Sequence, residues 1–572
     1  MRKIINLVKS DFLSYLLIIV IGLLAGRWLL QPGYFNMHDD LQMMRQLAMH
    51  ECFRDLQIPC RWTPHMGYGF GFPLFNYYPP LPYLVGEVIK VLGFSFVDTV
   101  KATFLLSFLI SGLTMYILSR EFWGRAGGFL SAVFYIWAPY HSVDIFVRGA
   151  MNEAWALCWF PLALWSGYKF IKDKKFSFFL TVVLSWAALL LSHNLMAMIF
   201  TPLFGIWCLF WFWKLNKWKQ APQLTLAGLW SIGLAAFFTI PVFLEQKFVH
   251  VETLVQGYYE YVAHFANTYQ ILFSRFWGYG PSAWLTDGDR MSFQIGHLHW
   301  IVSIILIFLV VFRIWRKKKI QTLDYIILFF AAAGWFASFM VHSRSTPIWQ
   351  TFDKFLKFVQ FPWRFLTLSI LCFSFISGAT VIFLEKGKGL IKFLIVFTLS
   401  ACIIIWNWHY FEPEYGKMGP LTDREKFSAA AWDLQQTAGI YDYLPNGAKT
   451  APKEAQKSVG EILEGGGEVY DMIQTSNFAE FKVNIISEQA KIRIGIFEYP
   501  GWKVFLDGNE ASIYIGDDDW GRMHIDAPKG EHTITAKLIN TPARTAGNAI
   551  SLVSWAALLT IPVLRKKIKR GF

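Results

Sequence analysis

Charged residues are scarce in this chain. Only 16% of its 572 residues are Asp, Glu, Lys or Arg, whereas 55% are hydrophobic and 18% are aromatic. A water-soluble domain cannot hide that much apolar side chain inside a core. The composition therefore excludes an ordinary soluble protein and indicates an integral membrane protein.

Several motifs of soluble enzymes are also missing. The sequence has no Walker loop, no dinucleotide-binding fingerprint, no His-x-x-x-His motif and no closely spaced Cys pair of the metal-binding kind. The cytoplasmic loops between the predicted membrane spans are too short to hold a nucleotide-binding domain. Any energy-rich donor must therefore lie in the membrane or come from outside. The sequence predicts no definite cofactor, and binding of a divalent cation remains an alternative.

Long apolar runs are abundant. Twelve runs approach the ~20 residues that a helix needs to cross a bilayer. The sequence therefore predicts a polytopic α-helical membrane protein with about twelve spans. The runs are 12–30, 102–119, 126–143, 153–170, 176–191, 195–213, 222–243, 298–314, 323–341, 366–384, 390–408 and 547–564.

The net charge of +13 follows the expected topology. If Arg2, Lys3 and Lys9 are cytoplasmic, every second loop and the basic tail Arg565–Arg570 are cytoplasmic too. The inner segments then hold about 25 basic and about five acidic residues, as the positive-inside rule requires. The positive charge is explained by the topology of the chain in the membrane. It is therefore no sign of nucleic-acid binding, and we exclude nucleic acid as a partner. We expect a multi-pass protein of the bacterial cytoplasmic (plasma) membrane with both termini inside.

Three external stretches are long enough to carry function. Residues 31–101 and 244–297 are loops of the transmembrane domain 1–408, and 409–546 is a separate domain. Residues 547–572 form the last span and the cytoplasmic tail. From about residue 478, alternating apolar residues predict strands, as in Phe481, Val483 and Ile485. We expect an extracytoplasmic β-sandwich there, with turns at 507–509, 516–517 and 529–530.

The first external loop also holds two cysteines. Cys52 and Cys60 could form a disulfide in an oxidising compartment. Two free thiols are the interpretation that we favour from the sequence. The other four cysteines lie in predicted spans and are most simply apolar packing residues.

An ionisable cluster, His38-Asp39-Asp40, follows the first apolar run. Apolar residues at helical spacing from His38 to Leu56 predict an amphipathic helix on the bilayer surface. Carboxylates are favoured at a helix start, so one of the two Asp residues could be its N-cap. The other would remain available for chemistry.

A second group of polar residues lies at the outer ends of the predicted spans. Charges at that depth are expensive unless they are paired or functional. Arg148 could pair with Asp144 or Glu153 as a purely structural ion pair. His193 could be a polar hairpin tip, and an Arg at a span end could be a snorkelling anchor. The candidate substrate- or phosphate-binding residues are His38, Arg148, Glu153, His193, Arg344 and Arg364.

Motifs along the chain resemble those of a known family. The region from about 36 to 165 resembles the bacterial membrane proteins called 6-pyruvoyl-tetrahydropterin synthase-related. The C-terminal part resembles the outer domain of the YfhO-type membrane proteins through Tyr499–Val504 and Gly530-Glu531-His532. The first resemblance rests on His38-Asp39-Asp40, Arg61–Pro64, Gly67-Tyr68-Gly69, Asn76–Tyr83, Ala138–Tyr140, Val147–Ala150 and Glu153, and is extended by Ser192–Asn194 and Gln360–Arg364.

Both groups are similar to the wider GT-C class of glycosyltransferases, which use polyprenyl-phosphate-linked sugars. In that class an acidic residue of the first external loop is the catalytic base, which implies this role for Asp39 or Asp40. The resemblance therefore implies transfer of a sugar from a polyprenyl-phosphate donor to a glycan or protein acceptor. Two alternatives stay open: a transporter or flippase for a lipid-linked saccharide, and a non-catalytic cell-envelope scaffold.

Overall fold

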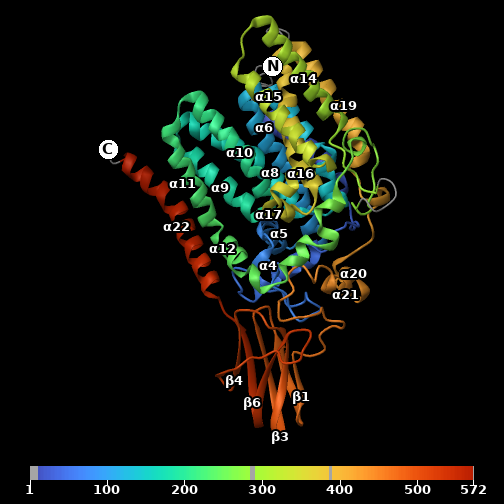
Figure 1. Cartoon of the computed structure of the whole chain (residues 1–572), viewed down its shortest axis with the longest axis vertical. Helices are drawn as coiled ribbons and strands as arrows, with labels where there is room; N and C mark the ends of the chain where they lie inside the picture. The colour runs from blue at the N-terminus through green and yellow to red at the C-terminus, as the bar shows by residue number, and fades with distance from the viewer. Residues whose placement is uncertain (1–10, 284–289, 385–388, 571–572) are drawn as a thin grey trace. The chain divides into compact units, whose positions relative to one another are not determined.

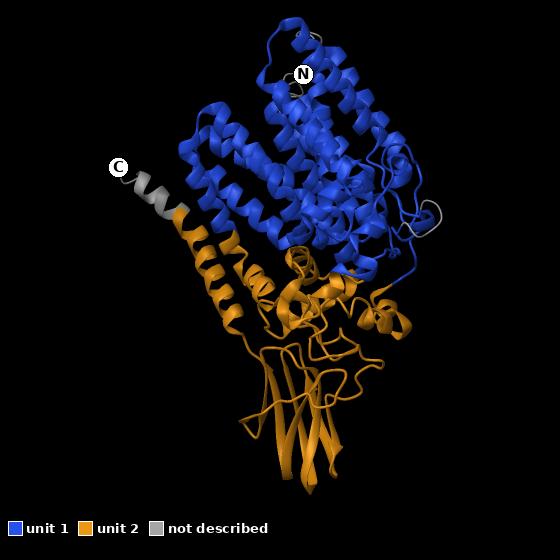
Figure 2. Ribbon diagram, viewed as in Figure 1, with its two compact units in different colours: residues 1–40, 97–231, 255–421 blue, residues 41–96, 232–254, 422–572 orange. Residues whose placement is uncertain are grey.

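The structure is a computed structural model that describes residues 11–283, 290–384 and 389–570. It consists of two compact units (Figure 2). The first unit contains residues 1–40, 97–231 and 255–421, and the second contains 41–96, 232–254 and 422–572. Arg2, Lys3, Lys9, Lys386 and Lys388, which enter the charge argument, lie outside the described residues, as do the side chains of the basic tail. The orientation therefore stays a prediction.

The first unit is a bundle of long apolar helices (Figure 1). Helix α8 packs against α9 and α10, while α18 packs against α14 and α15. The helices are α2 (Asp11–Ala25), α6 (Phe96–Ile136), α8 (Met151–Asp173), α9 (Phe176–Ser192), α10 (Asn194–Leu215), most of α11 (Ala221–Leu234), α14 (His297–Lys317), α15 (Thr322–Met340), α18 (Leu366–Ser377) and α19 (Gly389–Asn407).

All twelve predicted segments are helical, but not all are long and apolar enough to cross a membrane alone. Six helical stretches of the described chain meet that condition, or up to seven if the bent pair 218–248 is one span. The count of twelve is therefore not confirmed. Helix α2 has 15 residues, which reach only about 22 Å at the rise of an α-helix. The predicted span 102–119 and the first part of 126–143 merge into α6, which ends at Ile136 and contains a break at Gly124, whose φ is 72°.

The second unit combines several short helices and one long helix, α22, with a β-sheet. Its helices are α3 (Gln42–Arg54), α4 (Leu74–Tyr77), α5 (Leu81–Val91), α12 (Ala236–Glu245), α20 (Asp423–Lys426), α21 (Ala429–Thr437) and α22 (Pro542–Arg570). Helices α12 and α22 pack against each other. The interleaved segments mean that this unit cannot form until distant parts of the chain meet.

Helix α3 differs from the predicted surface helix. Its polar side chains Gln42, Arg45 and Gln46 are all buried. Arg45 donates a hydrogen bond to Tyr78, and Gln46 donates to the backbone carbonyl of Tyr83. The polar face thus meets partners from later in the loop instead of water. The N-cap of this helix is Leu41, with no side-chain cap, so neither Asp occupies the N-cap position that the sequence left open for one of them.

The strands form one antiparallel sheet of six strands instead of the predicted two-sheet sandwich. The order is β1-β3-β6-β4-β5, with β2 also paired to β3. The alternating residues around Phe481 belong to a single strand of 20 residues, whose pairing shifts register between Ile485 and Gln489. The strands are β1 (Gly460–Glu464), β2 (Gly467–Gln474), β3 (Phe478–Phe497), β4 (Trp502–Leu506), β5 (Asn509–Ala511) and β6 (Arg522–Leu538).

The predicted turns have mixed outcomes. The turn at Asp507-Gly508 joins β4 to β5, and 516–517 lies in the loop before β6. Lys529-Gly530 is not a turn, because it lies inside β6 at the register shift opposite Ile485–Gln489. Glycine permits the backbone of this irregularity, since Gly530 has a φ of +132°. Glycine therefore marks a turn at Gly508 but a position beside a register shift at Gly530.

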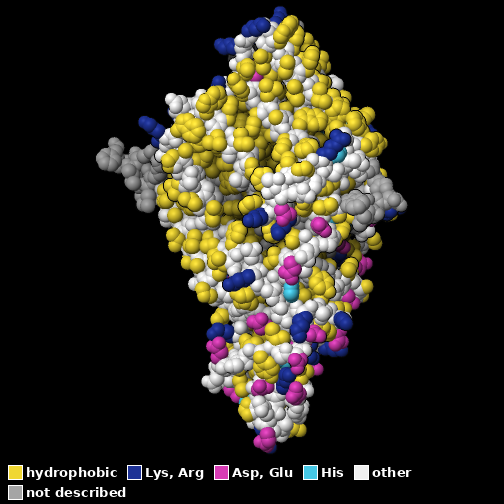
Figure 3. All heavy atoms as spheres, in the orientation of Figure 1, with side chains coloured by type: hydrophobic (Ala, Val, Ile, Leu, Met, Phe, Trp, Pro, Cys, Tyr) yellow, Lys and Arg dark blue, Asp and Glu magenta, His cyan; other side chains and the backbone are white. Residues whose placement is uncertain are grey.

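Surface composition separates the helices from the sheet. On the face shown in Figure 3, hydrophobic side chains gather over the helices of the first unit, whereas charged side chains of both signs are scattered over the sheet. Many large apolar side chains of α14 and α19 are exposed, including Phe308, Trp315, Phe393 and Phe397. Apolar surface on this scale suits contact with lipid.

Cys52 and Cys60 form a disulfide, with their Cα atoms 5.4 Å apart. The favoured prediction of two free thiols is therefore wrong. The residues are separated by one end of α3 and a tight turn, and that turn brings their side chains together. Sequence spacing alone could not reveal this approach.

The segment that carries the two Asp residues is held by backbone hydrogen bonds inside the first unit. Tyr34 pairs with Gly419. The N–H groups of His38 and Asp39 donate to the carbonyls of Val147 and Arg148, each at 2.9 Å. Gly149 has a φ of +62°, and a Cβ there would overlap Met37. A side chain at position 149 would therefore need an unfavourable backbone conformation and would also meet the side chain of Met37.

We expect Gly149→Ala to destabilise the first unit and displace residues 37–40. The left-handed backbone costs an L-residue about 1–2 kcal/mol, and the overlap with Met37 adds to it. Gly257→Ala is the matched control, because Gly257 has a φ of +60° with no atom within 4 Å of its Cβ position. Thermal unfolding midpoints in detergent should fall further for Gly149→Ala. Equal falls would contradict the importance of the close approach.

Candidate active site

The turn between α6 and α8 buries a network of ionisable side chains. It comprises α7 (Pro139–Ser142) and a π-helical turn, η2 (Val143–Val147). Arg148 Nη1 lies 2.5 Å from Asp144 Oδ1 and 2.8 Å from Glu153 Oε2. Tyr140 donates from its hydroxyl to Glu153 Oε1 at 2.7 Å, and its oxygen accepts from Arg148 at 3.1 Å. The predicted ion pair of Arg148 therefore exists and involves both carboxylates.

Arg364 reaches the same network from a distant segment. It lies in η10 (Pro362–Phe365), and its Nε is 3.4 Å from Glu153 Oε2. The neighbouring Trp363 lies under the guanidinium of Arg148, 4.3 Å from the ring centroid, a cation–π geometry. The motif around residue 363 thus supplies both a second cation and an aromatic face for the first. We call the set Asp144, Arg148, Glu153 and Arg364 the arginine–carboxylate cluster.

His193 lies beside the arginine–carboxylate cluster. It is the N-cap of α10. The adjacent Ser192 accepts a hydrogen bond at its carbonyl from Asn152 Nδ2 at 2.8 Å, which joins this break between helices to the start of α8. Burial, followed by the positive charge of Arg364, lowers the pKa of His193 to about 3. The imidazole is therefore neutral at neutral pH.

The two carboxylates of the cluster disfavour each other's ionisation. Burial, followed by the charge of Glu153, raises the pKa of Asp144 well above its ordinary value. Two carboxylates that share one buried cation rarely both ionise, because each disfavours the charge of the other. With Asp144 protonated, the cluster holds two cations and one anion. It then carries one net positive charge, which suits a negatively charged ligand.

Asp39 and Asp40 are half-buried on the segment that pairs with residues 147–148. Burial raises the pKa of the nearby Tyr34, and the negative charges of Asp40 and Asp39 raise it further. His38 is exposed, and its Nε2 is 2.7 Å from the carbonyl of Tyr279. The acid pair and the arginine–carboxylate cluster are therefore linked directly through the backbone of Arg148.

Arg344 is placed differently from the other candidates. It lies on an exposed turn, η8 (Ser343–Ser345), where its backbone N–H donates to His342 Nδ1 at 3.1 Å. Among the described residues it makes no hydrogen bond or ion pair with the cluster. Its phosphate-binding role stays a prediction. Tyr140, by contrast, received no role from the sequence, although it bridges Arg148 and Glu153; its position between Pro139 and His141 was the available signal.

Metal ligands are not grouped in the described residues. Nowhere in ranges 11–283, 290–384 and 389–570 do three or more His, Cys, Asp or Glu side chains meet in a geometry that could hold a metal ion. His193 and Glu153, two of the candidate binding residues, are both near Arg364. Their surroundings are positively charged.

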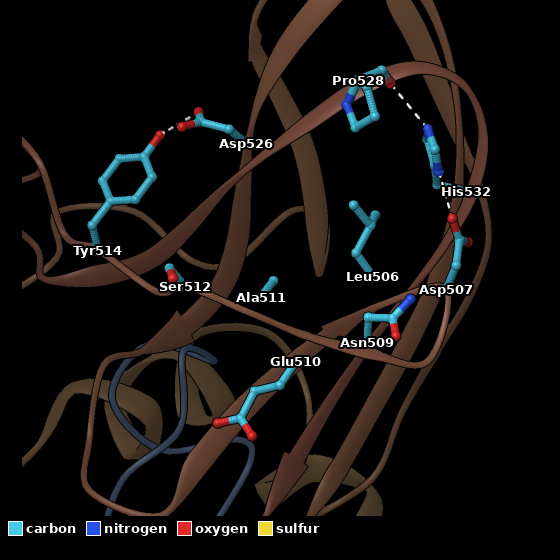
Figure 4. A pocket seen from close by; sticks show the side chains of 10 residues that line it. All are labelled: Leu506, Asp507, Asn509, Glu510, Ala511, Ser512, Tyr514, Asp526, Pro528 and His532. Atoms are coloured by element: carbon cyan, nitrogen blue, oxygen red, sulfur yellow. Dashed lines mark hydrogen bonds and ion pairs between the residues drawn. The ribbon is translucent and has the colours of Figure 1, made fainter.

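The sheet of the second unit carries a polar hollow of about 450 Å³ (Figure 4). Its polar groups are oriented by one another: Tyr514 donates to Asp526 Oδ1 at 2.7 Å, and His532 Nδ1 is 2.6 Å from Asp507 Oδ2. The lining residues are Leu506, Asp507, Asn509, Glu510, Ala511, Ser512, Tyr514, Asp526, Pro528 and His532. Carboxylates and amides that face an open hollow can accept hydrogen bonds from hydroxyl groups.

Comparison with known proteins gives three findings. An uncharacterised protein of Lactococcus lactis subsp. cremoris (strain MG1363) is 24% identical over 319 residues, which cover 54% of this chain and 49% of the relative. The chain thus spans about half the length of this curated relative. The archaeal oligosaccharyltransferase AglB from Archaeoglobus fulgidus, solved with an inhibitory peptide and a dolichol-phosphate, is similar with a TM-score of 0.40 and 12% identity. That match covers 71% of this chain and 56% of AglB.

The third finding is a match to a protein family. The model of the 6-pyruvoyl-tetrahydropterin synthase related domain, described as a membrane protein, matches residues 75–413. The match covers more than half of the chain and contains Arg148, Glu153, His193 and Arg364. It agrees with the resemblance carried by the motifs of the first 165 residues. The chain is therefore a multi-pass membrane protein that belongs to the 6-pyruvoyl-tetrahydropterin synthase related family.

Proposed function

We propose that the chain is a membrane glycosyltransferase that moves a sugar from a polyprenyl-phosphate-linked donor to an extracytoplasmic glycan or protein acceptor. The observation that carries the proposal is the backbone link between Asp39 and Arg148, at 2.9 Å. It joins a pair of carboxylates to a cluster of buried arginines within one unit. A base and a stabiliser of negative charge are the two groups that such a transfer needs.

The proposed reaction uses these groups in sequence. Asp39 or Asp40 accepts the proton of the acceptor hydroxyl. At the same time the oxygen of that hydroxyl bonds to the anomeric carbon of the donor. The bond between that carbon and the phosphate oxygen breaks, and polyprenyl phosphate leaves. Arg148 and Arg364 stabilise the leaving phosphate through the net positive charge of their cluster. Glu153 and His193, whose imidazole is neutral, orient the acceptor or a cation.

The proposal includes a topology. We place the site and the sheet of the second unit outside the cytoplasmic membrane, with both chain termini inside. The distribution of basic residues supports this orientation. A disulfide between Cys52 and Cys60 supports it as well, since disulfides persist in oxidising compartments. The predicted count of twelve spans is part of the same topology.

Single Asp39→Asn and Asp40→Asn variants test the base. One of them should lose 10²-fold or more of its transfer rate, in the range of about 10²–10⁴ that proton transfer contributes. Amide and carboxylate have nearly the same shape, so expression and donor binding should remain near normal. The measurement is release of polyprenyl phosphate from a panel of polyprenyl-phosphate sugars by the purified protein in nanodiscs.

Asp353→Asn is the control, because it removes an exposed carboxylate from the same unit. It should transfer at the rate of the unmodified protein. Full activity of both the Asp39 and the Asp40 variants, with the control also active, would show that the assignment of the base is wrong.

Asp144→Asn tests the charge of the cluster. Because the folded pKa of Asp144 is raised, the folded state holds a proton that the unfolded state releases above about pH 4. Stability should therefore fall as pH rises from about 5 toward the folded pKa. The Asn variant cannot lose a proton, so its unfolding midpoint should exceed that of the unmodified protein increasingly toward pH 9. A difference that is the same at every pH would indicate that Asp144 is ionised.

The polar hollow favours a second candidate function, in which the sheet binds a glycan. In the enzyme this surface would hold the acceptor, whereas in a non-catalytic scaffold it would be the functional site. The double variant Asp507→Asn/Asp526→Asn should weaken binding of cell-envelope glycan about tenfold or more, since each lost charged acceptor costs about 1.5–3 kcal/mol at most. The measurement is retardation in affinity electrophoresis, with Asp471→Asn on β2 as the control. An unchanged retardation would remove the hollow from both functions.

A further inference from the structure

A second buried arginine pair lies wholly inside the second unit, apart from the arginine–carboxylate cluster. Arg61 comes from the loop that follows α3, and Arg544 from the first turn of α22. Their side chains are almost completely buried, with 4% and 1% of each residue exposed. Arginine is almost never buried to this degree unless its charge and its N–H groups are paired.

Arg544 and Glu245 form the paired half of this group. Arg544 Nε lies 3.0 Å from Glu245 Oε2. The same oxygen accepts from Asn76 Nδ2 at 2.8 Å, and the other oxygen of Glu245 accepts from Thr541. Both oxygens of Glu245 are therefore already hydrogen-bonded by residues other than Arg61.

Arg61 is the unpaired half. Its Nη2 donates to Asn548 Oδ1 at 3.0 Å, a neutral partner one helical turn after Arg544. Within the described ranges, Arg61 Nε and Nη1 and Arg544 Nη2 have no hydrogen-bond partner. Burial, followed by the like charge of Arg544, lowers the pKa of Arg61 to about 10, while Glu245 opposes the shift. Arg61 is still charged at neutral pH.

The number of carboxylates differs between the two arginine groups. The arginine–carboxylate cluster contains two, one of them protonated, whereas Arg61 and Arg544 share only Glu245. One positive charge and three donor nitrogens are left uncompensated in a buried place. Water could accept the hydrogen bonds, but it could not neutralise the charge. Guanidinium groups bind the oxygens of phosphate in a bidentate manner, with both charge and geometry matched.

We propose that Arg61 and Arg544 form a binding site for a phosphate group, either inorganic phosphate or the phosphate of a lipid headgroup. Bound phosphate bridges the loop after α3 to the start of α22 and so stabilises the second unit. The site is independent of the proposed transfer reaction. Neither Arg61 nor Arg544 is among the candidate phosphate-binding residues predicted from the sequence.

The test compares unfolding midpoints of the full-length protein. In neutral detergent, inorganic phosphate should raise the midpoint saturably by a few degrees, as expected for a ligand that binds only the folded state. Phosphate also stabilises proteins by exclusion from their surfaces, but that effect does not saturate. The second arm adds lipid to the protein in neutral detergent, either phosphatidic acid or, as the phosphate-free reference, diacylglycerol. A response to inorganic phosphate indicates a soluble ligand, and a response to phosphatidic acid alone indicates a lipid.

Two variants establish the site. Asn548→Asp places a carboxylate where Arg61 Nη2 already donates, so it should raise the midpoint without ligand and abolish the saturable response. Arg61→Gln should also abolish the response. The matched control is Arg522→Gln, which removes a buried arginine of the same unit that is paired with Asp518 at 2.7 Å; its response should persist. Absence of a saturable response in both arms, or its persistence in Asn548→Asp, would overturn the proposal.

Discussion

The cost of burying charge is the constraint on which the rest of this structure depends. An ionised side chain that leaves water must find opposite charge and hydrogen bonds, or it loses its proton. Arg148 meets this requirement through Asp144 and Glu153, and Arg544 meets it through Glu245. The first solution is local in the sequence and is joined by the distant Arg364, whereas the second spans almost three hundred residues. The ion pairs therefore hold together the turns, helix ends and loops that carry them.

The same constraint connects structure to chemistry. A cluster in which two arginines and a fixed carboxylate are already oriented can stabilise a developing negative charge without rearranging. Asp39 is tied to this cluster through the backbone of Arg148, which limits how far the acid pair can move from it. In the second unit the compensation is incomplete, because Arg61 has only a neutral partner in Asn548. Both units thus combine apolar packing with sites of residual positive charge.

Local patterns predicted much of the fold. Every predicted span is helical, and the alternating residues around Phe481 and Ile492 are strands, because both patterns report which residues must avoid water. Predictions failed where a partner came from elsewhere in the chain. The polar face of α3 is covered by Tyr78 and Tyr83, and Gly530 lies within β6 because Ile485 of β3 pairs with it. For the site, the sequence named Arg148, Glu153, His193 and Arg364, whereas Arg344 lies outside the cluster and Tyr140 was missed.

The sequence by itself determined that this is a multi-pass membrane protein of its family, because hydrophobic runs and motifs are local properties. Only the tertiary structure decided how the chain divides into two interleaved units, that Cys52 and Cys60 are joined, and which buried charges are paired. The physical reason is distance along the chain. Glu245 and Arg544 are brought to 3.0 Å across almost three hundred residues, and no local pattern encodes which of several carboxylates a buried arginine will meet.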